Sequence, residues 1–153
     1  MIEVEVYGCR SKKKIEFYKL AINHFFYQIL PKRKNIVIDL CIEKKLNADA
    51  FCTEISPSYF VIEVAKELPI LEQIRCLAHE VVHCKQYLKK QLIYKDGNVY
   101  WKNKIFENHA LTSRWQDDFK SEYQTYIEMP WEKEAFGLEE SMFNNFLMYY
   151  NSI

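Results

Sequence analysis

The sequence has little glycine and proline, with 3 Gly and 4 Pro in 153 residues. These two residue types dominate turns and flexible linkers, so their scarcity leaves little room for long connections. A length of 153 residues suits one domain, and an apolar fraction of 49% supplies the side chains of a buried core. We therefore expect residues 1–153 to form a single domain and not a disordered chain.

An excess of one charge is also missing, since 21 basic residues balance 21 acidic ones. Without a net positive field, binding to nucleic acid or to an anionic membrane is not expected. Two short basic clusters, at residues 12–14 and 32–34, flank a predicted helix. Such clusters are typical of solvated helix ends.

Long apolar runs and paired cysteines are absent as well. No apolar stretch approaches the roughly 20 residues of a membrane-spanning helix. The first residues alternate apolar and acidic side chains, unlike the basic start and apolar run of a secretory signal. The five cysteines are spread singly, with no CxxC pair, which indicates free thiols. We therefore expect a cytoplasmic protein without membrane contact.

Hydrophobic periodicity predicts an α+β order of elements. The expected elements are a strand at 2–6, a helix at 11–30, a strand at 36–42, a hairpin of 51–55 and 59–64, a helix at 68–92, a second hairpin of 92–94 and 99–101, and a final helix at 130–150. Ser11 is the expected cap of the first helix and Pro31 its stop. Residues 102–124 are polar and mixed, and no element is assigned to them.

The predicted helix 68–92 contains the pattern H-E-x-x-H at His79, Glu80 and His83. Two histidines four residues apart lie on one helical face, so both imidazoles can bind one zinc ion. Glu80 lies beside them and can take a proton from a zinc-bound water, whose pKa the metal lowers toward about 7. The pattern therefore predicts two zinc ligands and a general base.

The apolar stripe of the same helix supports this interpretation. At about 100° per residue, His79 and His83 point away from the stripe that contains Ile74. They therefore face a second surface, where a cleft is expected. The alternative is two surface histidines and a solvated Glu80. Cys76 shares the histidine side, but an ordinary buried thiol is the simpler interpretation.

A catalytic zinc usually has three protein ligands, so a third must come from elsewhere in the chain. The metzincin pattern needs Gly and His three and six residues beyond His83, where this chain has Gln86 and Lys89. That class is therefore excluded. The other histidines, His24 and His109, are more typical of surface or hydrogen-bonded histidines.

Two glutamates near the start of the final predicted helix are better candidates. Glu132 lies within the apolar arc of that helix, whereas Glu134 lies toward Ser141 and Asn144. A carboxylate on a buried face is costly unless it is paired or bound to metal. This favours Glu132 as the third ligand, with Glu134 as the alternative. Glu139, also within the arc, is either a supporting carboxylate or a cap on a solvent gap.

H-E-x-x-H followed one helix later by E-x-x-A resembles the gluzincin-type zinc peptidases. The resemblance implies one zinc ion held by His79, His83 and Glu132, with Glu80 as base. It also implies that Ala135 is the small residue that lets the two helices approach closely. The implied fold is zincin-like: a mixed or antiparallel sheet packed against the H-E-x-x-H helix, a hairpin and a C-terminal helix that bears the glutamate.

Many gluzincins have an acidic or amide residue four positions after the glutamate ligand, to orient a histidine. This chain has Phe136 there, so that role is unassigned. The hairpin after the H-E-x-x-H helix is also similar to that of SprT-like proteins. Those proteins use a third histidine as ligand, and their DNA-linked role is therefore not expected here.

The expected activity is hydrolysis of a peptide or protein by a zinc-activated water, with Glu80 transferring the proton to the leaving amine. Strand 59–64 is the expected sheet edge for an extended substrate. The oxyanion donor is open among Tyr123, Tyr126, His109 and Arg114.

Two further hypotheses belong to other functional classes. A zinc-bearing domain that binds a partner protein without cutting it would lack activity on a peptide library. A metal-free interaction module that exposes its many tyrosines would contain no stoichiometric zinc. The sequence indicates neither the substrate nor the oligomeric state.

Overall fold

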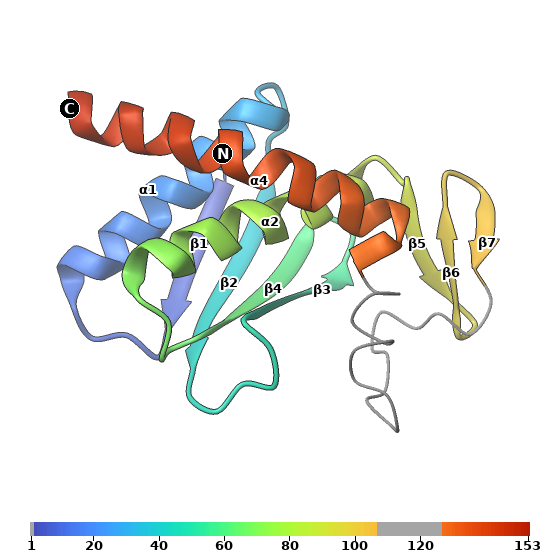
Figure 1. The fold of residues 1–153 in the computed structure, drawn as a ribbon, viewed down its shortest axis with the longest axis horizontal. Helices are drawn as coiled ribbons and strands as arrows, with labels where there is room; N and C mark the ends of the chain where they lie inside the picture. The colour runs from blue at the N-terminus through green and yellow to red at the C-terminus, as the bar shows by residue number, and fades with distance from the viewer. Residues whose placement is uncertain (1, 107–126) are drawn as a thin grey trace.

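A computed structural model describes residues 2–106 and 127–153 of the chain. Within these ranges the protein is α+β, as predicted, with three helices and two sheets (Figure 1). The elements in order are β1 (Ile2–Tyr7), α1 (Lys12–Ile29), β2 (Ile36–Glu43), β3 (Ala50–Ser56), β4 (Tyr59–Ala65), α2 (Ile70–Leu88), β5 (Leu92–Lys95), β6 (Asn98–Trp101), β7 (Lys104–Phe106) and α4 (Pro130–Ser152).

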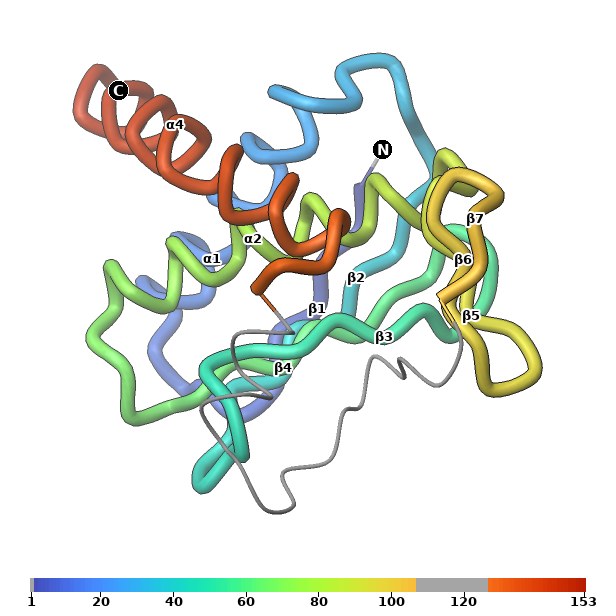
Figure 2. The backbone as a smooth tube through the Cα atoms, turned by 45° about the vertical axis from the view of Figure 1, so that its right-hand side comes forward, coloured from blue at the N-terminus to red at the C-terminus, as the bar shows by residue number. Residues whose placement is uncertain are grey.

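The larger sheet is mixed, with strand order β1-β2-β4-β3. β1, β2 and β4 are parallel, and β3 runs antiparallel to β4. Buried and partly buried residues alternate along β2, so one face of the sheet is the core face. The helices lie on that side (Figure 2). Ile38, Phe60 and Phe25 are fully buried where α1 and α2 cover the sheet.

One prediction about this sheet is wrong. The strand expected at its edge, residues 59–64, lies in the interior, because β4 pairs with β2 on one side and with β3 on the other. The chain leaves β2, returns as β3 on the outside and then enters β4 between them. In the described residues, β1 and β3 are therefore the edge strands.

The helix ends follow local chemistry. The Oγ of Ser11 caps α1 by accepting a hydrogen bond from the backbone N–H of Lys14 at 3.2 Å, as predicted. α4 begins with Pro130 in its first turn, also as predicted. α2 is shorter than expected and ends at Leu88, because Lys90 takes a positive φ of 57° that stops the helix.

The smaller sheet is antiparallel, with order β5-β6-β7. Its first turn matches the predicted hairpin, since Asp96 and Gly97 have φ of 55° and 79°. β7 was not predicted. Its turn also uses two positive φ values, 49° and 71°, but at Lys102 and Asn103, so no glycine marks it in the sequence.

The predicted hairpin of β3 and β4 is confirmed. All five cysteines are free thiols, as expected, and the Sγ atoms of Cys52 and Cys84 lie 3.6 Å apart. No described helix is long and apolar enough to cross a membrane.

Candidate metal centre

The two histidines of the H-E-x-x-H pattern lie one turn apart on α2 and face α4. Their ring centroids are 4.9 Å apart, with an interplanar angle of 77°. His79 and His83 are only 6% and 7% exposed, because the first turns of α4 cover them. The predicted second surface of α2 is therefore an interface between two helices.

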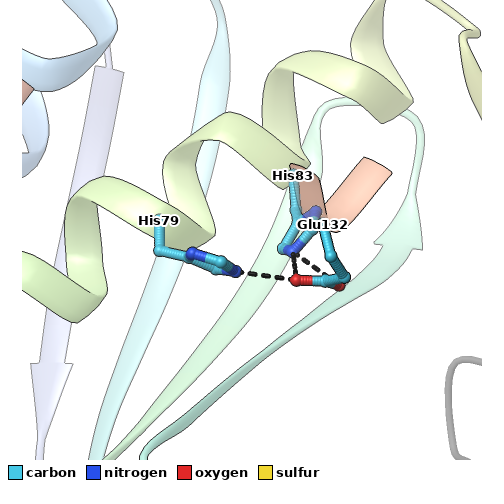
Figure 3. A group of neighbouring side chains, drawn as sticks. All are labelled: His79, His83 and Glu132. Atoms are coloured by element: carbon cyan, nitrogen blue, oxygen red, sulfur yellow. Dashed lines mark hydrogen bonds and ion pairs between the residues drawn. The ribbon is translucent and has the colours of Figure 1, made fainter. Parts of the chain in front are cut away.

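Glu132, from the first turn of α4, points at both imidazoles (Figure 3). Its Oε1 lies 2.9 Å from Nε2 of His79, and its Oε2 lies 3.1 Å from Nε2 of His83. The three ligand atoms all lie within 4.8 Å of one another. The structure thus brings together His79, His83 and Glu132 in a buried group that could hold a metal ion.

The other nitrogen of each ring has its own acceptor. Nδ1 of His79 lies 2.7 Å from Oε1 of Glu139, and Nδ1 of His83 lies 2.8 Å from Oε1 of Gln86. An imidazole that donates from Nδ1 presents Nε2 as its ligand atom. Both Nε2 atoms point at Glu132, so the donor set fits a metal bound at that position.

Gln86 is the site residue that the sequence interpretation missed. Fully buried on α2, it donates through Nε2 to the carbonyl of Trp131 at 2.9 Å and to Glu134 at 3.0 Å. The available signal was its position three residues after His83, on the same helical face. Gln86 therefore joins a histidine of α2 to the first turn of α4.

Glu134 does not join the cluster. Its carboxylate accepts hydrogen bonds from Lys85 at 2.9 Å and from Gln86, on the far side of the glutamine from His83. The choice of Glu132 over Glu134 from the apolar arc of α4 agrees with this geometry. Of the two alternatives for Glu139, its contact with His79 favours the supporting carboxylate.

Close packing of the two helices supports the arrangement. Ala135 is fully buried, which agrees with its predicted role as a small contact residue. The Phe136 ring lies 4.5 Å from the His79 ring in an edge-on arrangement, so it packs on a histidine and does not hydrogen-bond to one. Trp131 packs against the smaller sheet, 5.3 Å from Phe106, and so fixes the start of α4.

The buried carboxylate of Glu132 is stabilised by positive charge on its neighbours. Burial alone would lower the pKa of His79, but its hydrogen bonds to the carboxylates of Glu132 and Glu139 raise it to about 10. Burial would raise the pKa of Glu132, but the two histidines lower it to about 2. These shifts favour positively charged imidazoles around a negatively charged Glu132. A divalent cation is a stronger counter-charge for a buried carboxylate.

Glu80 lies beside this cluster and is itself buried. Burial raises its pKa, while the nearby His83 and His79 act in the opposite direction. No hydrogen bond of its carboxylate lies within the described residues, and its oxygens are not among the fully buried atoms that lack a partner. A carboxylate beside a group that could hold a metal ion is placed for proton transfer.

The remaining candidates lie elsewhere. His24 is hydrogen-bonded to Gln28 at 2.9 Å and stacks on Tyr149, as expected for a satisfied histidine. Cys76 is not part of the cluster, and burial raises the pKa of its thiol to about 12. The four candidate oxyanion donors, Tyr123, Tyr126, His109 and Arg114, lie outside the described residues.

No protein-family model, curated protein or solved structure gives a significant match to this chain. The fold and site therefore define its class on their own: an α+β protein with a buried His-His-Glu group able to bind a metal ion.

Proposed function

We propose that this protein is a zinc-dependent metallopeptidase with a zincin-like fold and a gluzincin-type site. The observation that carries the proposal is the contact of Glu132 with Nε2 of both His79 and His83, next to the buried Glu80. Two imidazoles and one carboxylate are a ligand set of catalytic zinc sites, which keep a fourth position for water.

His79, His83 and Glu132 would hold the zinc ion, which would lower the pKa of a water molecule and polarise the scissile carbonyl. Glu80 accepts the proton of the attacking water and delivers it to the nitrogen of the leaving amine as the C–N bond breaks. Glu139 and Gln86 hold the two imidazoles in the tautomer that presents Nε2.

The proposed substrate is a peptide or protein in extended conformation. β3 pairs with β4 on one side only in the described part of the chain, and it contacts α2, the helix of the site. Its free backbone groups can pair with an extended segment. The free thiols favour a reducing compartment such as the cytoplasm.

The test is cleavage of an unfolded protein and a peptide library by the zinc-loaded chain. We expect Glu80→Gln to keep the zinc but to lose activity by about 10²- to 10⁴-fold, the usual contribution of a general base. Glu72→Gln, an exposed glutamate on the same helix, is the matched control and keeps full activity. Zinc binding without cleavage would instead favour the non-proteolytic binding domain, and undiminished cleavage by Glu80→Gln would refute the assigned base.

A further inference from the structure

A cavity away from the candidate metal centre lies where the parallel strands end and the helices begin. Because β1, β2 and β4 are parallel, their carboxyl ends share one edge of the sheet. α1 follows β1 and α2 follows β4, so both helices start at that edge (Figure 1). A cavity of about 290 Å³ lies there, between the ends of the strands and the starts of the helices.

The charge around this cavity is of one sign. Arg10 and Lys14, at the start of α1, and Lys66, after β4, line it, and no acidic residue of the described ranges does. Among the described residues, the side chains of Arg10 and Lys14 have no hydrogen-bond or ion-pair partner. Lys66 donates only to the carbonyl of Gly8, at 3.4 Å. Three uncompensated cations around one cavity repel one another.

The walls of the cavity are ordered in the absence of a ligand. Tyr18 donates to Oε1 of Gln73 at 2.6 Å, and Gln73 donates to the carbonyl of Ala65 at 3.1 Å. Both side chains are buried and line the cavity. Gly8 has a φ of 81°, and a Cβ there would lie 2.2 Å from the carbonyl oxygen of Ile42. The loop after β1 therefore packs directly on the end of β2.

The start of α1 adds to the positive potential. Its first turn has no acidic residue and instead carries Lys12, Lys13 and Lys14. Cations are unfavourable at the positive end of a helix dipole. This cost, together with the repulsion around the cavity, is relieved when an anion binds among these groups.

We propose that this cavity binds a small phosphorylated molecule through its phosphate group. A phosphate carries close to two negative charges at neutral pH and accepts paired hydrogen bonds from arginine. The volume lies at the lower limit of ligand pockets, which suits a small molecule. The proposal is independent of the metallopeptidase function.

A long nucleic acid fits this surface less well. The outer face of the larger sheet begins beside the cavity and carries only acidic charge along β1, β2 and β4, at Glu3, Glu5, Asp39, Glu43 and Glu63. Burial is the main cause that raises the pKa of Glu63. A hydrogen bond with the neighbouring Glu43 raises this pKa further. A polyanion that extended beyond the cavity would meet this repulsive face.

The test is calorimetric titration of the full chain with inorganic phosphate, ribose 5-phosphate and, as neutral control, ribose, all at fixed ionic strength. We expect saturable binding of the two phosphates at one site and none of ribose. The double variant Arg10→Gln/Lys66→Gln should weaken binding at least about tenfold, as expected for two lost charge-assisted hydrogen bonds. All variants should keep their zinc.

Lys34→Gln is the matched control, since Lys34 is an exposed lysine of the other basic cluster, after α1. It should change phosphate affinity by less than about twofold. The proposal is overturned if phosphate binding is not saturable, or if the control weakens it as much as the double variant. Tighter binding of a single-stranded oligonucleotide than of ribose 5-phosphate, lost in the double variant, would overturn it in favour of a nucleic-acid surface.

Discussion

The carboxylate of Glu139 lies 2.7 Å from Nδ1 of His79, whereas Nε2 of the same ring faces Glu132. Glu132 and Glu139 are seven residues apart on α4, so they project from the same helical face about two turns apart. One helix therefore supplies both the candidate ligand Glu132 and a carboxylate that contacts a second candidate ligand, His79. Glu139 thus makes the contact with a histidine that Phe136 cannot make by hydrogen bonding.

From this contact we predict that Glu139→Ala lowers zinc affinity by about 10- to 100-fold, because His79 loses the group that fixes its ring. Glu139→Gln retains most of the affinity, since an amide oxygen can still accept from Nδ1. Competition with a chromophoric chelator measures both values. Glu140→Ala is the matched control, because Glu140 is the next residue and contacts Arg75 instead. Equal affinity for Glu139→Ala and Glu140→Ala would rule out the orienting role.

Gln86→Leu should destabilise the protein. The substitution leaves the carbonyl of Trp131 and Nδ1 of His83 without their buried partner. Each unsatisfied buried group costs roughly 1–3 kcal/mol. The free energy of unfolding, measured in urea, should therefore fall by roughly 1–3 kcal/mol or more. Zinc affinity should fall as well. A variant as stable as the parent would mean that water or a side-chain shift replaces the glutamine.

The contact between α2 and α4 depends on a small residue at position 135. Ala135 is fully buried, so Ala135→Leu should destabilise the fold by about 1–3 kcal/mol through overpacking. It should also move Glu132 away from the histidines and reduce zinc binding.

Gly137→Ala provides the contrast on the same helix. A Cβ at Gly137 meets nothing within 4 Å, and the position is helical. The free energy of unfolding, measured by thermal unfolding, should therefore rise by about 0.5–1 kcal/mol because alanine has the higher helix propensity. The zinc content should not change. If both substitutions destabilised the protein equally, tight helix packing would not be the cause.

Several features of the fold could be predicted because they depend on local patterns. The alternation of Ile36, Ile38 and Leu40 identified β2, and Ser11 identified the start of α1. The ligand group could be predicted for the same reason. His79 and His83 are fixed by helical spacing, and Glu132 was favoured over Glu134 because it lies on the buried side of its helix.

Other features depend on pairings that the sequence does not encode locally. The position of β4 inside the sheet follows from the return of β3 on its outer side, which no spacing reveals. The turn before β7 uses Lys102 and Asn103 in a conformation that usually selects glycine. The role of Gln86 depends on a carbonyl 45 residues away, that of Trp131.

Zinc content of the purified chain tests the central claim most directly. By elemental analysis we predict one zinc ion per chain, lost in Glu132→Ala and retained in Glu134→Ala, with circular dichroism to confirm that both variants are folded. Absence of zinc from the folded parent chain after incubation with zinc, or its retention in Glu132→Ala, would contradict the proposed site.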